Sequence, residues 1–342
     1  MPGPMARRID VTGAGGVRLA AWEFGPPRTA ADRAAVPRAF VPAQAQPYEA
    51  HETYEVAETL EGSVARGAGE AGRVRQAAAP EGGREGPRPG VLLLHGLMGR
   101  ASHWAATARW LADRYRVVAL DLRGHGHSEK PPPAAYTREA YTEDVEAAVE
   151  QLGLGPAVVI GHAMGALAAW QLAARRPDLV RALVVCDMRA SALGAASQRE
   201  WESWFKAWPL PFATLEAART WFAEQDPWVD RPSPARGAFY AEVLHECPDG
   251  WRPVFDPEHM LVSRETWAYD AHWDELALVR CPALVVRGLD GELGRAEAQE
   301  MVRVLPRGQY AEILDAGHLL HYERPEAWRA VVEPFLDGVL TS

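Results

Sequence analysis

The chain has few cysteines, no long block of like charge and no long apolar run, and each absence excludes a class of protein. Its three cysteines, Cys186, Cys247 and Cys281, are odd in number and widely spaced, so neither a disulfide framework nor a metal knuckle is indicated. No run of about 18 apolar residues occurs, which argues against a membrane span. The net charge is −10 and no basic arm is present, so we expect no nucleic-acid partner.

The N-terminal composition and the overall hydrophobic content set further limits. Residues 1–16 contain no apolar segment, so a signal peptide is not indicated, and we expect a cytoplasmic protein without a metal or cofactor. Hydrophobic residues make up 48% of the 342, enough for one large α/β domain or two smaller ones. No sequence signal points to a particular oligomeric state.

Segment 26–90 differs in composition from the rest of the chain. Its second half, from Gly62 to Gly90, has only Val64 and Val74 as large apolar residues. Such a stretch buries too little apolar surface to offset the entropy of ordering it. We therefore interpret 26–90 as a largely mobile, low-complexity insertion. The predicted organisation is a core α/β domain made of 1–25, 91–187 and 278–342, with a Trp-rich helical cap at 188–277.

Short apolar runs alternate with helical patterns over most of the remaining chain. The runs are 91–94, 117–120, 158–160, 182–186, 283–287 and 310–314, and segment 17–24 alternates like a half-buried strand. This alternation predicts a mostly parallel sheet with helices on both faces. Functional residues are then expected at the carboxyl ends of the strands.

The sequence from Val158 to Gly165, Val-Val-Ile-Gly-His-Ala-Met-Gly, is a nucleophile elbow without a nucleophile. In the motif G-x-S-x-G, a strand turns sharply into a helix and raises a Ser hydroxyl above the sheet. Gly161 and Gly165 are in place, but Ala163 stands where Ser is expected. Either an enzyme has had its Ser replaced to trap a substrate, or a natural relative no longer carries out this chemistry.

Four segments in the expected order resemble the α/β-hydrolase superfamily. They are Leu94–Gly99, Asp121–Ser128, the elbow, and Ala316–Pro325. The resemblance covers roughly residues 9–24 and 91–338. It implies an α/β-hydrolase fold, with a mostly parallel eight-stranded sheet flanked by helices and a helical cap inserted after the strand that ends at Cys186. It also implies an oxyanion hole formed by the backbone N–H groups of Leu97 and Met164.

The resemblance also implies a base and an acid. His318 is the general-base candidate, in the family-like context Ala-Gly-His-Leu-Leu-His-Tyr-Glu-Arg-Pro. Two carboxylates are candidates for its partner. Asp187 lies 24 residues after Ala163, as in a subgroup of esterases and lactonases, whereas Asp290 lies one residue before the position that most of the superfamily uses. We favour Asp187 and keep Asp290 as the alternative.

Met164 favours Ser as the missing nucleophile. Gly-His-Ser-Met-Gly is common in esterases, lactonases and thioesterases, whereas epoxide hydrolases and haloalkane dehalogenases, which use Asp, usually carry Trp in place of this Met. The expected chemistry is hydrolysis of an ester or lactone through an acyl-enzyme. Because His318, Asp187, Gly161 and Gly165 all remain, we favour a deliberate Ser-to-Ala replacement over a decayed site.

Eight of the 13 Trp residues fall between 188 and 277. They indicate either packing of the cap on the core or an aromatic pocket for a bulky, flat, apolar group. The candidate substrate contacts are Met98, Met188, Trp204, Trp208, Trp221 and Leu319. No Arg cluster or Gly-rich loop suggests phosphate or coenzyme A, so the expected partner is a small-molecule ester or lactone.

The overall plan is similar to that of actinobacterial hydrolases that open large aromatic lactones such as zearalenone. Two alternatives stay open. One is a natural, non-catalytic ligand-binding relative that has kept the pocket. The other is a carbon–carbon bond hydrolase or a cofactor-free haloperoxidase, because these enzymes share the same triad.

Overall fold

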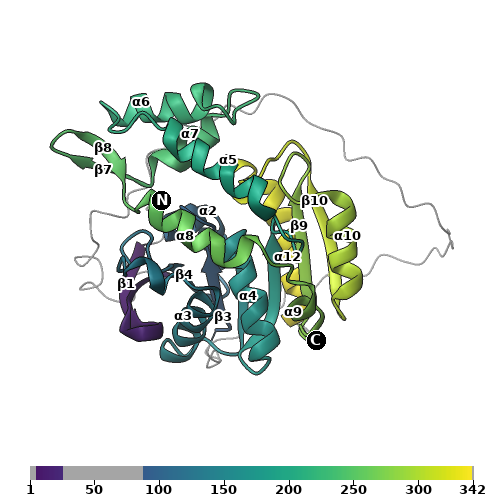
Figure 1. Cartoon of the computed structure of the whole chain (residues 1–342). Coiled ribbons are helices and arrows are strands. Elements are labelled where there is room, and N and C mark those ends of the chain that lie inside the picture. Colours follow the sequence, from purple (N-terminus) through teal and green to yellow (C-terminus); the bar gives the residue numbers. More distant parts are fainter. Residues whose placement is uncertain (1–4, 26–87, 341–342) are drawn as a thin grey trace, which may run out of the picture. The chain divides into compact units, whose positions relative to one another are not determined.

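The computed structural model describes residues 5–25 and 88–340 (Figure 1). The insertion predicted at 26–90 therefore lies outside the described residues except for its last three. Gly90 belongs to the core, because it is the first residue of strand β3 (Gly90–Leu94). A side chain on Gly90 would collide with the backbone of Leu154, which explains why a glycine begins this strand.

Eight strands form one sheet in the order β1-β2-β4-β3-β5-β6-β9-β10, as the resemblance implied. The strands are β1 (Met5–Thr12), β2 (Arg18–Gly25), β3, β4 (Arg116–Asp121), β5 (Ala157–His162), β6 (Val180–Cys186), β9 (Ala283–Gly288) and β10 (Gly308–Ile313). The β1–β2 and β2–β4 pairs are antiparallel, and all other neighbours are parallel. The parallel strands have continuous apolar runs because both faces of the sheet are covered.

Helices cover both faces of the sheet (Figure 1). Successive side chains of β3 show the two layers, because Leu92 and Leu94 join one apolar cluster while Val91 and Leu93 join the other. The first layer contains α3 (Arg138–Gln151), α4 (Met164–Arg175), α9 (Trp273–Ala277) and α10 (Arg295–Val304), and the second contains α2 (Ala105–Leu111) and α12 (Pro325–Leu340). Short helical turns occur at Ala14–Gly16, Ala101–Trp104, Pro133–Ala135 and α11 (Leu320–Glu323).

The chain between β6 and β9 forms the predominantly helical region predicted there. Its helices are α5 (Gly194–Ala207), α6 (Leu215–Thr220), which continues as a π-helical turn at Trp221–Gln225, α7 (Pro234–Ala241), α8 (Pro257–Ala268) and α9. A two-stranded hairpin, β7 (Leu244–Cys247) and β8 (Gly250–Pro253), was not predicted. Helix α9 packs against α4 and α10, so the end of this region belongs to the helical layer of the core.

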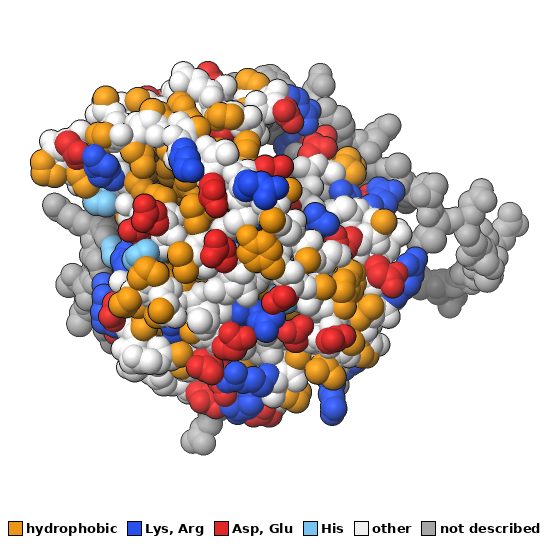
Figure 2. Space-filling view, viewed as in Figure 1, with side chains coloured by type: hydrophobic (Ala, Val, Ile, Leu, Met, Phe, Trp, Pro, Cys, Tyr) orange, Lys and Arg blue, Asp and Glu red, His pale blue; other side chains and the backbone are white. Residues whose placement is uncertain are grey.

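Figure 2 shows acidic and basic side chains interspersed over one face of the molecule. None of the described helices combines the length and apolar character needed to cross a bilayer.

Candidate active site

The turn between β5 and α4 has the geometry that the elbow motif predicts. Strand β5 ends at His162, helix α4 begins at Met164, and Ala163 lies between them with φ 46° and ψ −122°. A positive φ is costly for a residue with a side chain and persists only where its surroundings enforce it. The backbone N–H of Ala163 donates to the carbonyl oxygen of Cys186 at 2.9 Å, which holds this turn against the end of β6.

The two elbow glycines allow close contact between neighbouring backbones. A side chain on Gly161 would collide with the carbonyl oxygen of Gly165 and the backbone of Ala166. A side chain on Gly165 would collide with the carbonyl oxygens of His95 and Leu94. Larger residues at either position would therefore push α4 away from the sheet and displace residue 163.

The structure brings His318 and Asp187 together. Nδ1 of His318 lies 2.7 Å from Oδ2 of Asp187, although the two residues are 131 positions apart in the sequence. The Asp187 side chain is fully buried, and it also accepts hydrogen bonds from the backbone N–H groups of Glu292 at 2.8 Å and Leu293 at 3.3 Å. These donors fix the carboxylate, and with Nδ1 occupied, Nε2 is the His318 nitrogen left for proton transfer.

Asp290, the alternative acid, has a different environment. Its side chain is 53% exposed, and its carboxylate pairs with Arg231 at 3.0 Å. A carboxylate that the sequence analysis did not identify lies closer to the base, because Oε1 of Glu292 is 3.9 Å from Nδ1 of His318. The structure therefore places Asp187 and Glu292, and not Asp290, beside His318.

These carboxylates determine the charge of the base. Burial alone would lower the pKa of His318, but the charge of Glu292 and the hydrogen bond and charge of Asp187 together raise it to about 9. At neutral pH the His318 side chain is thus predominantly an imidazolium ion. It acts as a base only where the pH is high enough to remove that proton.

Two further histidines and a cysteine lie behind His318. One donor atom from each of His162, Cys186 and His321 lies within 4.8 Å of the others, and all three residues are buried. Burial lowers the pKa of His162 well below its usual value and that of His321 to about 3, so both rings are neutral. The ring of His321 stacks on Trp104 at 4.2 Å and lies 4.7 Å from that of His162, so the three side chains form a closely packed group.

One candidate oxyanion donor, Met164, follows residue 163 in the chain, and the other, Leu97, lies in a turn close to it. Leu97 is in a tight turn closed by a 2.9 Å hydrogen bond from the N–H of Gly99 to the carbonyl oxygen of Gly96. Its own N–H makes no hydrogen bond to any described residue. Met164 is the first residue of α4, so its N–H has no partner within the helix. A Cβ on Gly96 would lie 3.1 Å from Cβ of Ala163, so this turn packs directly on the elbow.

The Trp residues named as substrate contacts lie in an aromatic cluster of the cap. Trp204 is 1% exposed, and its Nε1–H donates to Asp226 at 2.8 Å. Its ring stacks on Trp228 at 4.7 Å and meets Trp208 edge-on at 5.0 Å. Trp221 is half-buried and packs edge-on against Phe222 and near Phe212. These contacts favour packing over ligand binding for Trp204 and Trp208.

Each of the remaining candidate substrate contacts directly follows a candidate catalytic or oxyanion-hole residue in the sequence. Met98 follows Leu97, Met188 follows Asp187, and Leu319 follows His318. All three side chains are buried in the apolar cluster that continues into the cap. Their role as substrate contacts stays a prediction.

Comparison with known proteins agrees with this geometry. Residues 89–325 match the family model for the alpha/beta hydrolase fold. The 2-(acetamidomethylene)succinate hydrolase of Mesorhizobium japonicum is 27% identical over 265 residues, covering 74% of this chain and 90% of that protein. A crystal structure of E-2-(acetamidomethylene)succinate hydrolase superposes with a TM-score of 0.70 at 21% identity, covering 98% of this chain and 99% of the other.

A second solved structure has a higher sequence identity. The enol-lactonase from Burkholderia xenovorans LB400 superposes with a TM-score of 0.59 at 25% identity, covering 75% of this chain and 94% of that one. The family model spans well over half of the chain. This chain therefore belongs to the α/β-hydrolase fold family.

Proposed function

We propose that this chain is a serine-hydrolase scaffold for carboxylic esters or lactones, with Ala163 at the position of the nucleophile. The observation that carries the proposal is the 2.7 Å pair of His318 and Asp187 beside an elbow that lacks only its hydroxyl. Family membership supports hydrolysis as the type of reaction, and the enol-lactonase is a solved structure of similar fold whose name specifies a lactone.

In the serine form, the steps follow from the positions of these groups. The hydroxyl introduced by Ala163→Ser attacks the carbonyl carbon while Nε2 of His318 accepts its proton and Asp187 holds Nδ1–H. The N–H groups of Leu97 and Met164 stabilise the oxyanion. His318 then protonates the leaving alcohol, and water activated by His318 releases the acid from the acyl-enzyme.

With Ala163 the covalent step is missing. Loss of a triad nucleophile lowers turnover by about 10⁶-fold in comparable enzymes, while substrate binding persists. The elbow conformation and the His318–Asp187 pair are both intact, which supports a change confined to one residue. This is the behaviour of a substrate-trapping variant.

Restoring the hydroxyl tests the proposal. The parent chain and Ala163→Ser are compared on aryl esters and on macrocyclic lactones, including zearalenone, and the serine variant is treated with a fluorophosphonate that labels activated Ser. We expect turnover and labelling in Ala163→Ser only, and neither in the double variant Ala163→Ser/His318→Gln. A folded Ala163→Ser protein that neither labels nor hydrolyses any substrate contradicts the proposal.

Ala163 itself favours a second candidate, a non-catalytic ligand-binding protein. In that case Ala163→Ser would bind the same ligands as the parent chain without turning them over. Carbon–carbon bond cleavage and peroxide-dependent halogenation are further assays on the same two proteins, and activity confined to either would replace the ester assignment.

A further inference from the structure

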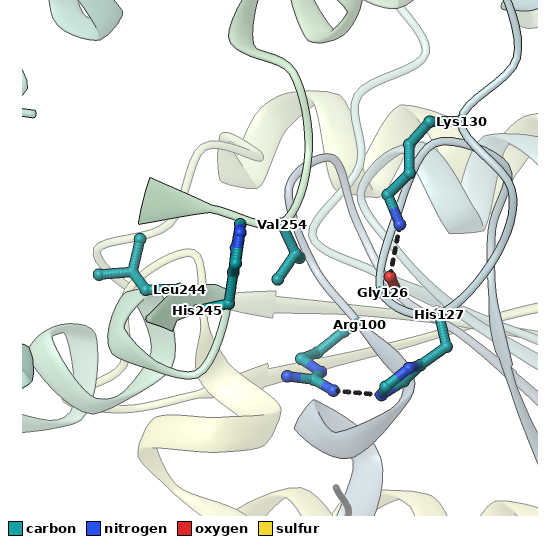
Figure 3. A pocket seen from close by; sticks show the side chains of 7 residues that line it. All are labelled: Arg100, Gly126, His127, Lys130, Leu244, His245 and Val254. Atoms are coloured by element: carbon teal, nitrogen blue, oxygen red, sulfur yellow. Dashed lines mark hydrogen bonds between the residues drawn. The ribbon is translucent and has the colours of Figure 1, made fainter. Parts of the chain in front are cut away.

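A cavity of about 360 Å³ has lining residues from both the core and the cap, and Figure 3 shows their side chains. It is lined by Arg100, Gly126, His127, Lys130, Leu244, His245 and Val254. The first four come from the loops that follow β3 and β4 in the core, and the last three from the β7–β8 region of the cap. None of the lining residues is acidic, although the chain as a whole carries a charge of −10.

Two cations in this cavity have no carboxylate partner among the described residues. Arg100 donates to the carbonyl oxygen of Glu242 at 2.6 Å and to Nε2 of His127 at 3.3 Å. Lys130 donates to the carbonyl oxygens of Gly126 at 2.6 Å and Ser128 at 3.0 Å. Neutral acceptors position both side chains but leave their positive charges uncompensated.

A buried carboxylate, Asp121, lies against the lining residue Gly126, because a Cβ added to Gly126 would lie 2.3 Å from its carboxyl group. It is 1% exposed and accepts hydrogen bonds from Trp22 Nε1–H at 3.0 Å and from the N–H groups of Ala101 at 2.7 Å and His127 at 2.9 Å. Burial lowers the pKa of Lys130, and the charge of Asp121 opposes this effect. Asp121 thus holds the two loops together, and its carboxylate is already engaged by these three donors.

The other lining residues add a hydrogen-bond donor and an apolar surface to the two positive charges. A guanidinium cannot accept a hydrogen bond, so Nε2 of His127 accepts from Arg100 and its proton is on Nδ1. Burial, the largest cause, and the charge of Arg100 lower the pKa of His127, so the ring is a neutral donor. Leu244 and Val254 add an apolar surface on the cap side.

We propose that this cavity binds a small organic carboxylate. The carboxylate group meets Arg100 and Lys130, and its short alkyl or aryl part contacts Leu244 and Val254. A cavity of about 360 Å³ with apolar walls exceeds what an inorganic anion alone would fill, which favours the organic acid. This is a second ligand site that does not require a nucleophile at residue 163, so it stands or falls separately from the proposed hydrolysis.

Calorimetry on the unaltered chain at low salt tests the proposal with three probes: butyrate, its neutral analogue butyramide, and inorganic phosphate. We expect butyrate to bind at least about tenfold tighter than either of the others, because butyramide lacks the charge and phosphate lacks the alkyl part that contacts Leu244 and Val254. Added sodium chloride should weaken the binding, since the two cations are partly exposed to solvent. Equal binding of butyramide, or tighter binding of phosphate, overturns the proposal.

Variants locate the binding. Lys130→Gln and Arg100→Gln are each expected to weaken butyrate binding at least about tenfold. The matched control is Arg280→Gln, a change at an exposed Arg just before β9, and it should have no effect. Arg100→Lys keeps the charge and should recover most of the affinity, which separates loss of charge from loss of fold.

The His318 imidazolium is the competing anion site, so His318→Gln is measured as well. Retained butyrate binding in His318→Gln supports the cavity. Binding that is lost in His318→Gln and unchanged in Lys130→Gln and Arg100→Gln places butyrate at the triad and overturns the proposal.

Discussion

Nε2 of His162 lies 2.9 Å from the carbonyl oxygen of His318. A carbonyl oxygen only accepts, so His162 carries its proton on Nε2 and fixes the backbone of the base from the residue that precedes the elbow. The two histidine rings are also close, with centroids 4.5 Å apart. The nucleophile position and the base are therefore connected directly at this point.

Removing this donor is expected to slow catalysis without changing substrate affinity. In the Ala163→Ser background, His162→Leu should lower kcat by about tenfold, the value of one hydrogen bond to a neutral acceptor, and leave KM unchanged. His162→Gln retains a donor and should recover part of the loss. An equal loss in the Leu and Gln variants would instead indicate a packing role.

The assignment of the acid is tested by a matched pair of variants. In Ala163→Ser, Asp187→Asn should reduce kcat by about 10⁴-fold, because an amide neither holds the correct tautomer nor stabilises the imidazolium. Asp290→Asn should stay within about twofold of Ala163→Ser, since its carboxylate pairs with Arg231 at the surface. The reverse result would assign the acid to Asp290.

The pH dependence follows from the charge of His318. Only the neutral imidazole accepts a proton, so kcat/KM of Ala163→Ser should rise with pH along a limb near the His318 pKa of about 9. Glu292→Gln removes a charge that raises this pKa, so its limb should move to lower pH. Glu300→Gln, a change in the exposed part of α10, should not move the limb. A limb that stays in place in Glu292→Gln would rule out the proposed influence of this carboxylate.

Packing and ligand binding predict different results for the cap tryptophans. If Trp204 packs the cap, Trp204→Ala should lower the free energy of unfolding by about 3–5 kcal/mol, measured by urea denaturation. Trp228 stacks on it but is 40% exposed, so Trp228→Ala should cost about 1 kcal/mol. A Trp204→Ala protein of unchanged stability that has lost affinity for an aromatic ester would favour the pocket interpretation.

The contact between the elbow and the sheet has a measurable effect on stability. Gly165→Ala should destabilise the fold by about 1–3 kcal/mol, because the methyl group meets the carbonyl oxygens of His95 and Leu94. Gly25→Ala, at the end of β2, is the control, since its Cβ would meet no described atom within 4 Å, and it should change stability by less than about 0.5 kcal/mol. Equal effects of the two changes would contradict this account.

The sequence predicts those elements whose characteristic residues are adjacent in the chain. The central strands were found because their apolar runs are continuous, and the elbow because its glycines and its β-branched strand are adjacent in the chain. Strand β1 was not separately identified, since Met5–Thr12 contains two Arg residues and only Ile9 and Val11 alternate clearly. The β7–β8 hairpin was missed because its strands are only four residues long, partly exposed, and without a regular alternation of apolar and polar residues.

Features made by residues far apart in the chain were harder to predict. No basic cluster was identified, because Arg100 and Lys130 come from different loops and meet only where β3 and β4 pair in the sheet. Glu292 was not predicted, because the loop pattern indicates an acid near Asp290 and contains no signal for a second carboxylate beside His318. Asp187 was favoured by its position in the chain, and the structure adds its hydrogen bonds to His318 and to the backbone of the next strand's loop.

The separation of Asp187 and His318 by 131 positions in the sequence has a consequence for biosynthesis. The elbow and the acid lie on neighbouring strands and are synthesised early, but the base follows the last strand, β10. Closing so long a loop is entropically costly and is offset only when β9 and β10 join the sheet. A chain whose synthesis has not yet reached His318 therefore holds the buried carboxylate of Asp187 without its histidine partner.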